Sequence, residues 1–499
     1  MDIEFPSSVD TFTRKKLFLI LAGIILGTLM GALDNLVVST AMPAIIDSLH
    51  QPDGLAFLID AYISSSAIGM VVFGKLSDHY DKKSVLLLTI VIFIIGSIFA
   101  GMSQNMSELI MLRVIQGFGS GGFLPVGLSV IARILPPKAR AQITGAVTSL
   151  IGIAIVGGPE MGAYIVATTT WRWVFYINIP FGIASFLIIM YFLPPLKSKL
   201  VGKFDVLGSL LLSSWVSLLL FPLVEMAYSN WKLTGPLTLF LLASSVSLFL
   251  IFLYMEIKIA KEPLIPFRMF RYRTVTADSF LSFFRGGILF SLSTFIAIFV
   301  TEVLLGTSGT LRDVLYGFIV PMVLGSIFGG ILLPKLSYKK TSLIGTMCVF
   351  IGFIPLLTIS PTTLPWAYLD HVPILGLVEG LIPIGFGIGF TMAPTTLSAQ
   401  YSVNPKDVGA STSIVQFMGN IGGSFVLTVL TVLLYFSYDS LVTSLPSSVS
   451  KTNSLGISEV AMSYAIREVF SILLFLSLIS LVSSLFVKGR LPISSQKSE

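Results

Sequence analysis

Long apolar stretches alternate with short polar segments along almost the whole chain. A helix that spans a bilayer needs about 20 mainly apolar residues, and many of these stretches reach that length. The first stretch follows Arg14-Lys15-Lys16 and is too long for the apolar region of a cleaved signal peptide, so we expect it to be the first span. We predict fourteen spanning helices, near residues 17–41, 55–76, 84–102, 107–132, 140–166, 173–194, 206–226, 236–256, 275–302, 313–334, 341–359, 372–398, 408–436 and 463–487.

The basic residues fall mainly on alternate connections between these stretches. With the N-terminus placed in the cytoplasm, 24 of the 31 Lys and Arg residues lie in cytoplasmic segments. Five lie in outer segments, namely Arg172, Lys232, Arg312, Lys451 and Arg467. Cytoplasmic loops of membrane proteins carry such an excess. A miscounted helix would invert every later connection, so the pattern predicts fourteen spans in a multi-pass protein of the cell membrane, with both termini cytoplasmic.

The composition agrees with a chain that lies mostly in lipid. Hydrophobic residues make up 54% of the sequence and charged residues 11%, whereas soluble domains carry about 25% charged residues. The net charge of +6 does not indicate nucleic acid, because the basic residues form short clusters between apolar stretches. The lipid bilayer is therefore the expected partner of most of the surface, and no nucleic-acid partner is expected.

Several kinds of chemistry have no sequence signal. The chain lacks the G-x-x-x-x-G-K-[ST] phosphate loop, so ATP is not the expected energy source. The three histidines, His50, His79 and His371, are far apart in the sequence and predict no metal site. The single cysteine, Cys348, excludes an internal disulfide and is expected to be a small core residue. We therefore expect neither an enzyme nor a bound cofactor or metal.

Two connections share a short motif. Lys75-Leu76-Ser77 and Lys335-Leu336-Ser337 are each followed by a Lys-Lys pair and a hydroxyl residue. Related halves are typical of transporters, which place the substrate site between them, although short basic loops can also resemble one another by chance. The repeat predicts a six-helix bundle over residues 1–200, an inserted helical hairpin over 201–262 and a second six-helix bundle over 263–499.

Ionisable residues within spans are costly and mark functional candidates. Asp34 lies in the first span, where an apolar environment favours the neutral form of a carboxyl group and would allow proton exchange near neutral pH. A static salt bridge or a place at the outer interface is the alternative. Arg113 stays charged and must pair or face water, so it is either a structural anchor or a coupling residue. Asp278 and Arg285 lie seven residues apart, on one face of the ninth span.

A third carboxylate follows a predicted kink. Glu160 comes directly after Gly158-Pro159, and Pro159 removes a backbone donor from the helix. A carboxylate at such a kink could bind a cationic substrate or a proton, or it could lie in water near the outer interface. Asp60 is a further acidic candidate near the outer end of the second span.

Together these motifs resemble the major facilitator superfamily, and within it the fourteen-span drug:proton antiporters. Gly74-Lys75-Leu76-Ser77-Asp78 with Lys82-Lys83 is similar to the cytoplasmic signature between spans 2 and 3, although Asp81 replaces its glycine. The resemblance implies that this loop, Asp78 above all, sets the inward–outward equilibrium. Residues 112–117, Leu-Arg-Val-Ile-Gln-Gly, are similar to the span 4 pattern, which implies a role in proton transfer for Arg113.

Further segments carry the same resemblance. Gly158 and Pro159 match the antiporter signature of span 5, which implies a conformational role, whereas Glu160 stands where the family usually has an apolar residue. Residues 33–43 resemble the span 1 motif of the fourteen-span group, and residues 171–180 and 262–266 are similarly specific to it. The implied fold is an all-α membrane protein with two six-helix bundles and two additional helices.

The expected function is proton-coupled efflux of lipophilic or cationic compounds by alternating access. Asp34 and Arg113 would couple protons, while Glu160, Asp60 and Asp34 would attract cationic substrate. The expected energy source is the proton motive force, and the protein is expected to be monomeric. Two alternatives remain at this point: a transporter of a physiological solute such as a lipid, metabolite or siderophore, and a membrane sensor that does not transport.

Overall fold

The computed structural model describes most of the chain. The described residues are 13–49, 55–196, 205–228, 231, 235–260, 263, 265, 267–306, 308–357, 372–404, 407–444 and 457–489. Within them, the side chains of a few residues, Asp60 among them, lie outside the description. The described secondary structure is helical and includes no strand.

The first part of the chain forms helices that match the first six predicted spans. Two of the spans are each built from two consecutive helices, α4 with α5 and α7 with α8. The helices are α1 (Arg14–Leu49), α2 (Leu55–His79), α3 (Lys82–Met102), α4 (Met106–Gly121), α5 (Phe123–Ile134), α6 (Pro137–Thr168), α7 (Trp173–Tyr176) and α8 (Asn178–Phe192).

The rest of the chain matches the other eight predicted spans. A short 3-10 helix, η3 (Phe267–Arg271), precedes α11, and a π-helical turn, η4 (Phe299–Val303), continues it. The long helices are α9 (Val206–Tyr228), α10 (Pro236–Lys258), α11 (Arg273–Ile298), α12 (Ser308–Leu332), α13 (Tyr338–Leu357), α14 (Val372–Tyr401), α15 (Val408–Ser444) and α17 (Ile457–Ser484).

Eleven helical segments of the described chain are long and apolar enough to cross a membrane. The other three predicted spans coincide with α2, α6 and α9, which are helical but do not belong to those eleven. The predicted helix positions are therefore confirmed, whereas fourteen crossings stay a prediction.

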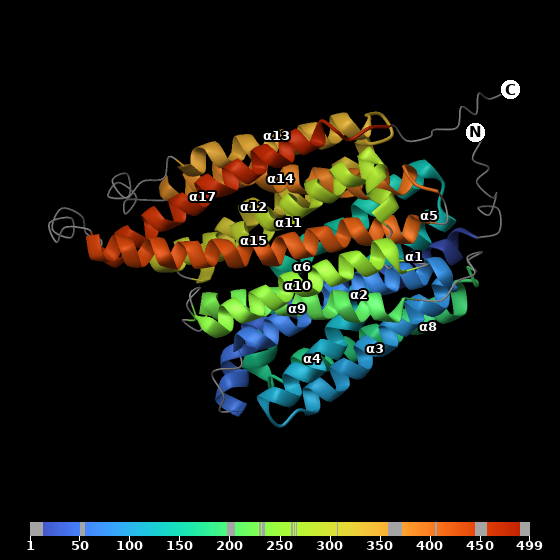
Figure 1. Ribbon diagram of the computed structural model, residues 1–499, viewed down its shortest axis with the longest axis horizontal. Helices are drawn as coiled ribbons and strands as arrows, with labels where there is room; N and C mark the ends of the chain where they lie inside the picture. Colours follow the sequence, from blue (N-terminus) through green and yellow to red (C-terminus); the bar gives the residue numbers. More distant parts are fainter. Residues whose placement is uncertain are drawn as a thin grey trace.

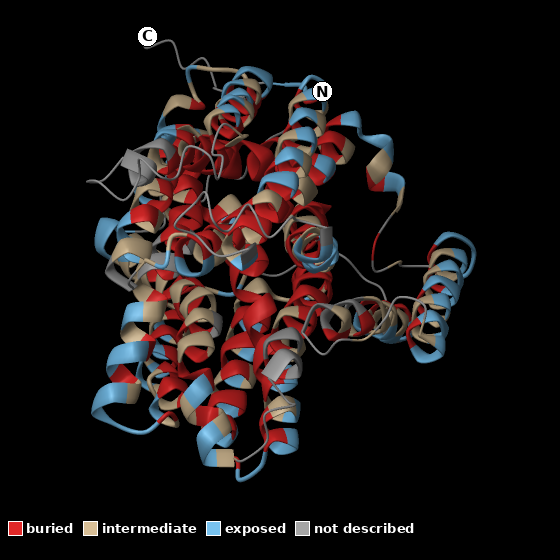
Figure 2. Ribbon diagram, turned by 90° about the vertical axis from the view of Figure 1, so that its left-hand side faces the viewer, coloured by how far each residue is buried: buried red, intermediate tan, exposed pale blue. Residues whose placement is uncertain are grey.

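The helices pack around separate apolar cores in the first and last parts of the chain. One core joins α1, α2, α3, α5, α6 and α8 around residues such as Phe93 and Phe123, and another joins α11 to α15 and α17 around Phe295 and Phe353. We call α1 to α8 the first group of helices, and α11 to α15 with α17 the second group. In Figure 1, α2, α3, α4 and α8 occupy the lower part of the molecule and α12, α13, α14 and α17 the upper part. Buried residues lie where helices face one another and exposed residues lie on the outer faces (Figure 2), as expected for helices that present an apolar surface to lipid.

The hairpin of α9 and α10 lies along the line where these two groups of helices meet. Helix α9 contacts both α2 and α15, and α10 packs on α9. Trp215 of α9 stacks against Phe249 and Phe252 of α10, with ring centroids 4.6 and 6.4 Å away. We call this line the seam between the two groups of helices.

Helices α6 and α12 make the closest backbone approach between the two groups. A Cβ atom on Gly145 of α6 would lie 2.7 Å from the carbonyl oxygen of Ser326 of α12. The Thr148 and Ser326 hydroxyls are 2.8 Å apart, and Ser326 donates to the Gly145 carbonyl at 2.9 Å. Small residues allow membrane helices to pack this closely, so the contact depends on glycine at position 145.

Candidate functional site

Asp34 lies at the centre of a buried polar cluster. It projects from α1 and is 1% exposed. Its carboxylate accepts hydrogen bonds from the Arg113 guanidinium of α4, from Gln116 Nε2 at 2.9 Å and from Asn178 Nδ2 of α8 at 2.6 Å. Two helices, α4 and α8, thus supply three donor side chains to one carboxylate, which stabilises its negative charge away from water.

Arg113 is equally enclosed. Its side chain is fully buried, and besides Asp34 it donates to Gln116 Oε1 at 2.8 Å. The guanidinium carbon lies 4.0 Å from the centre of the Tyr62 ring of α2, a favourable cation–π distance. Sequence alone left Arg113 as either an anchor or a coupling residue. Its direct pairing with Asp34 brings the two coupling candidates together, and both roles are compatible with the pair.

Close helix packing positions this cluster. A Cβ atom on Gly117 would lie 2.5 Å from the Tyr62 carbonyl oxygen, and one on Gly96 of α3 would lie 2.7 Å from the Gln116 backbone nitrogen. Glycine at these positions lets α4 lie directly against α2 and α3. Arg113, one turn before Gly117, is thereby placed over the Tyr62 ring, and Gln116 reaches both Asp34 and Ser97.

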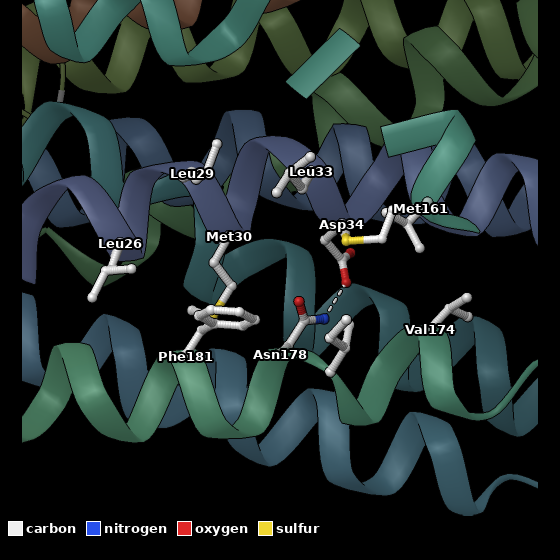
Figure 3. A pocket seen from close by; sticks show the side chains of 11 residues that line it. Leu26, Leu29, Met30, Leu33, Asp34, Met161, Val174, Asn178 and Phe181 are labelled. Atoms are coloured by element: carbon white, nitrogen blue, oxygen red, sulfur yellow. Dashed lines mark hydrogen bonds between the residues drawn. The ribbon is translucent and has the colours of Figure 1, made fainter. Parts of the chain in front are cut away.

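The cluster borders a small apolar pocket between α1, α6, α7 and α8. Figure 3 shows Asp34 of α1 and Asn178 of α8 turned toward each other, with Met30 and Phe181 nearer the opposite end. The pocket measures about 90 Å³, well below the roughly 300–1,000 Å³ of drug-sized sites. Its lining residues are Leu26, Leu29, Met30, Leu33, Asp34, Val37, Met161, Val174, Ile177, Asn178 and Phe181. This pocket therefore gives Asp34 apolar, confined surroundings and is too small for a drug-sized ligand.

The other predicted substrate residues do not join this cluster. Glu160 is exposed on α6, and its carboxylate accepts a hydrogen bond from the Tyr316 hydroxyl of α12 at 3.2 Å. Helix α6 continues through Pro159, and a Cβ atom on Gly158 would lie 2.6 Å from Leu36 Cβ of α1. Asp60 lies on α2, and its side chain is outside the description.

The predicted gating residues form a contact between α2 and the start of α15. The Asp78 carboxylate accepts hydrogen bonds from the backbone N–H groups of Gly409 at 2.9 Å and Ala410 at 2.6 Å, at the N-terminus of α15. Lys82 lies 3.5 Å from Asp78. The positive end of a helix macrodipole stabilises a carboxylate in this position. We refer to this end of the molecule as the Asp78 end.

Two further gating candidates lie differently. A Cβ atom on Gly74 would come within 2.4 Å of Ser413 Cβ on α15, so glycine allows the close approach of α2 to α15. Lys83 instead donates to the Met190 carbonyl oxygen of α8 at 2.6 Å. Lys83 therefore links helices of the first part of the chain and takes no direct part in the contact with α15.

The sequence analysis assigned no function to Gln116 or Asn178, although both donate hydrogen bonds to Asp34. Gln116 follows Arg113 by three residues, and Asn178 is a polar residue in an apolar stretch. Uncharged amides give a weak signal, because such residues also bond to water near span ends. Their contribution depends on the register of three helices.

Comparisons with known proteins agree with this architecture. The family model of the Major Facilitator Superfamily matches residues 24–427. Multidrug resistance protein 3 of Bacillus subtilis (strain 168) is 32% identical over 425 residues, covering 84% of this chain and 80% of that protein. Multidrug transporter protein MdtP of the same strain is 31% identical over 434 residues, covering 86% and 77%.

Solved structures share the fold at low sequence identity. A double-tryptophan mutant of XylE has a TM-score of 0.64 at 13% identity and covers 97% of this chain and 98% of that one. The human organic anion transporter MFSD10 has a TM-score of 0.58 at 14% identity and covers 93% and 99%.

Proposed function

Since the chain belongs to the Major Facilitator Superfamily and is a multi-pass membrane transporter, we propose that it exports lipophilic compounds, mainly cations, in exchange for protons. The observation that carries the proposal is the buried Asp34–Arg113 pair, whose carboxylate residue, Asp34, lines an apolar pocket. A paired carboxylate next to such a pocket can exchange its partner for a proton or a substrate cation.

Proton coupling follows from the charge balance of this pair. Asp34 and Arg113 neutralise each other at a site closed to solvent, and removal of either charge leaves the other uncompensated. Protonation of Asp34 must therefore be accompanied by new surroundings for Arg113, with water or with other partners. A change in protonation is thus linked to a rearrangement of α1 and α4.

The proposed substrate class rests on the pocket and on the relatives. Apart from Asp34 and Asn178, the pocket is lined by apolar side chains, which suits lipophilic compounds. The relatives from Bacillus subtilis are named for multidrug resistance or transport. Glu160 and Asp60 would supply further negative charge for cations as the site enlarges.

The proposed cycle is alternating access. Two six-helix bundles, residues 1–200 and 263–499, would rock about the midplane, and the hairpin of 201–262 would follow at their seam. The contacts of Asp78 with α15 and of α6 with α12 would hold the Asp78 end closed. In this proposal the Asp78 end and both termini face the cytoplasm. The protein works as a monomer in the cell membrane and is driven by the proton motive force.

The test is efflux of a fluorescent lipophilic cation from proteoliposomes with an imposed pH gradient. We expect gradient-dependent movement in the wild type and its loss in Asp34→Asn. Asp47→Asn is the matched control, because Asp47 lies on the same helix and is exposed. Unchanged efflux in Asp34→Asn would remove the coupling role, and no movement of any cation by folded protein would favour a physiological solute instead.

A further inference from the structure

A second buried carboxylate, Asp278, lies outside the cluster around Asp34. It projects from α11 and is 0% exposed. One of its oxygen atoms contacts the Ser398 hydroxyl of α14, and the other has no hydrogen-bond partner among the described residues. No basic side chain of the described chain comes within ion-pair distance of it. Asp34, by contrast, accepts hydrogen bonds from the Arg113 guanidinium and from the side-chain amides of Gln116 and Asn178.

An ionised Asp278 would leave one of the two contacts of Ser398 Oγ without a hydrogen atom. Ser398 Oγ lies within hydrogen-bond distance of the Asp278 carboxyl and, at 3.2 Å, of the Thr395 carbonyl oxygen. Both of these partners would accept, yet a hydroxyl has a single hydrogen to donate. A protonated Asp278 supplies the second hydrogen. In that state its O–H would donate to Ser398 Oγ, and Ser398 would donate to the Thr395 carbonyl oxygen.

The cost of burial leads to the same conclusion. An ionised carboxylate with one neutral donor and no cation in contact is strongly unfavourable in an apolar interior, and the group takes up a proton instead. Arg285 lies seven residues further along α11, about 10 Å along the helix axis. It donates to Thr391 O at 3.3 Å and to Thr395 Oγ1 and Ser282 Oγ at 3.1 Å, which are all neutral oxygen atoms.

The other titratable groups around Asp278 come from three neighbouring helices. Ala277, the adjacent residue, packs in a cluster with Tyr338 of α13, Tyr401 of α14 and Ala141 of α6. Arg140 of α6 lies 4.8 Å from the centre of the Tyr401 ring. Among the described residues of α15 and α17, which also pack on α11, none makes a hydrogen bond or ion pair with Asp278.

This cluster connects the exposure of Asp278 to the conformation. Ala141 comes from the first group of helices, whereas Ala277, Leu333, Tyr338 and Leu397 come from the second. If the two groups separate at the Asp78 end, Ala141 moves away and water reaches the region of Asp278. The O–H bond of Asp278 can then break, the proton passes to water, and the resulting carboxylate is hydrated.

We propose that Asp278 is a second proton-carrying carboxylate, which holds its proton in the conformation closed at the Asp78 end and releases it when that end opens. The inference rests on the proposed proton coupling and extends it to the second bundle. Asp34, ionised and paired, and Asp278, neutral and hydrogen-bonded to Ser398, are then in opposite protonation states in one conformation. When Asp278 then takes up its replacement proton from the opposite side of the membrane, each transport cycle moves one proton more than Asp34 alone can carry.

The protonation state is tested by infrared difference spectroscopy of the purified protein in lipid nanodiscs. We expect the carbonyl-stretch band of a protonated carboxylic acid at neutral pH in the wild type and in Asp34→Asn, and its loss in Asp278→Asn. In Ser398→Ala the same band should shift to higher frequency, because the acid loses its acceptor. This variant keeps the test valid if Asp278→Asn does not fold.

The carrying role is tested by the substrate gradient that proteoliposomes sustain at a fixed pH gradient. One proton fewer per cycle lowers that gradient about tenfold for each pH unit imposed, and we expect this fall in Asp278→Asn. An acid band that is absent in the wild type or persists in Asp278→Asn would overturn the inference, as would loss of the band with an unchanged substrate gradient. If the wild type sustains no gradient, the proposed antiport fails, whereas the infrared band still decides whether Asp278 is protonated.

Discussion

At the scale of single residues, the Asp34–Arg113 pair is constrained by burial and by opposite charge. Both side chains are fully enclosed, and each has its opposite charge in direct contact. Removing one partner of a buried ion pair is more harmful than replacing both, because the remaining charge is left without compensation. Stability measurements can therefore reveal the pair even when transport is not measured.

We predict that Arg113→Leu lowers the free energy of unfolding by about 3–5 kcal/mol, because Asp34 then keeps only its amide donors Gln116 and Asn178. The double variant Asp34→Asn/Arg113→Leu should recover part of this loss. The measurement is the apparent unfolding temperature in lipid nanodiscs. A double variant less stable than Arg113→Leu would contradict direct pairing.

The sequence identified Asp34 and Arg113 separately, because charged residues within apolar stretches are rare and easily noticed. It could not predict that they pair, since contact requires a particular rotation and depth of α1 against α4. Asn178 was harder still, because it comes from a third helix, α8, and carries no charge. The sequence also could not predict that Glu160 lies apart from this cluster, because its surroundings depend on how α6 packs against α12.

At the scale of helices, glycine positions decide how closely the two groups of helices approach. Gly145 and Gly157 both lie on α6, yet their surroundings differ. A Cβ atom on Gly145 would meet Ser326 O at 2.7 Å, whereas nothing lies within 4 Å of one on Gly157. Helix positions followed from hydropathy because each span is a continuous apolar stretch. The difference between Gly145 and Gly157 could not be predicted from hydropathy, because it depends on which helix packs against each glycine.

We predict that Gly145→Leu opens the Asp78 end, because α6 can no longer lie against α12, and that Gly157→Leu leaves it closed. Spin labels at the exposed residues Lys138 and Lys340, in a Cys348→Ala background, report the distance across this end. The distribution should shift to longer distances in Gly145→Leu alone. Equal distributions in the two variants would show that the α6–α12 contact does not control this end.

At the scale of the whole molecule, the contacts described between the two groups of helices include a charged one at the Asp78 end and packed ones along α6 and α12. The seam position of α9, between α2 and α15, places the hairpin beside the Asp78 contact. Sequence predicted the hairpin as an insertion from the spacing of two similar loops. It could not show which helices the hairpin touches, because the mainly apolar faces of α9 and α10 do not specify a partner.

The Asp78 contact should act as a latch whose loss changes the conformational equilibrium. Asp78→Ala removes the carboxylate that accepts from Gly409 and Ala410, and charge-assisted hydrogen bonds contribute about 1.5–3 kcal/mol each. We therefore expect the ratio of open to closed molecules at this end to rise at least about tenfold, with Asp78→Asn intermediate because its amide can still accept one bond. Spin labels at Tyr80 and Asn404, in the same Cys348→Ala background, measure the ratio.

Asp81→Ala is the matched control for the latch. Asp81 also caps a helix start, accepting from the Ser84 backbone N–H at 3.1 Å, but this helix is α3, within the first group. Loss of that cap should destabilise α3 locally and leave the distance between Tyr80 and Asn404 unchanged. If Asp81→Ala and Asp78→Ala shifted the equilibrium equally, the effect would come from the loop as a whole. A selective effect of Asp78→Ala would assign the latch to the carboxylate that links α2 to the start of α15.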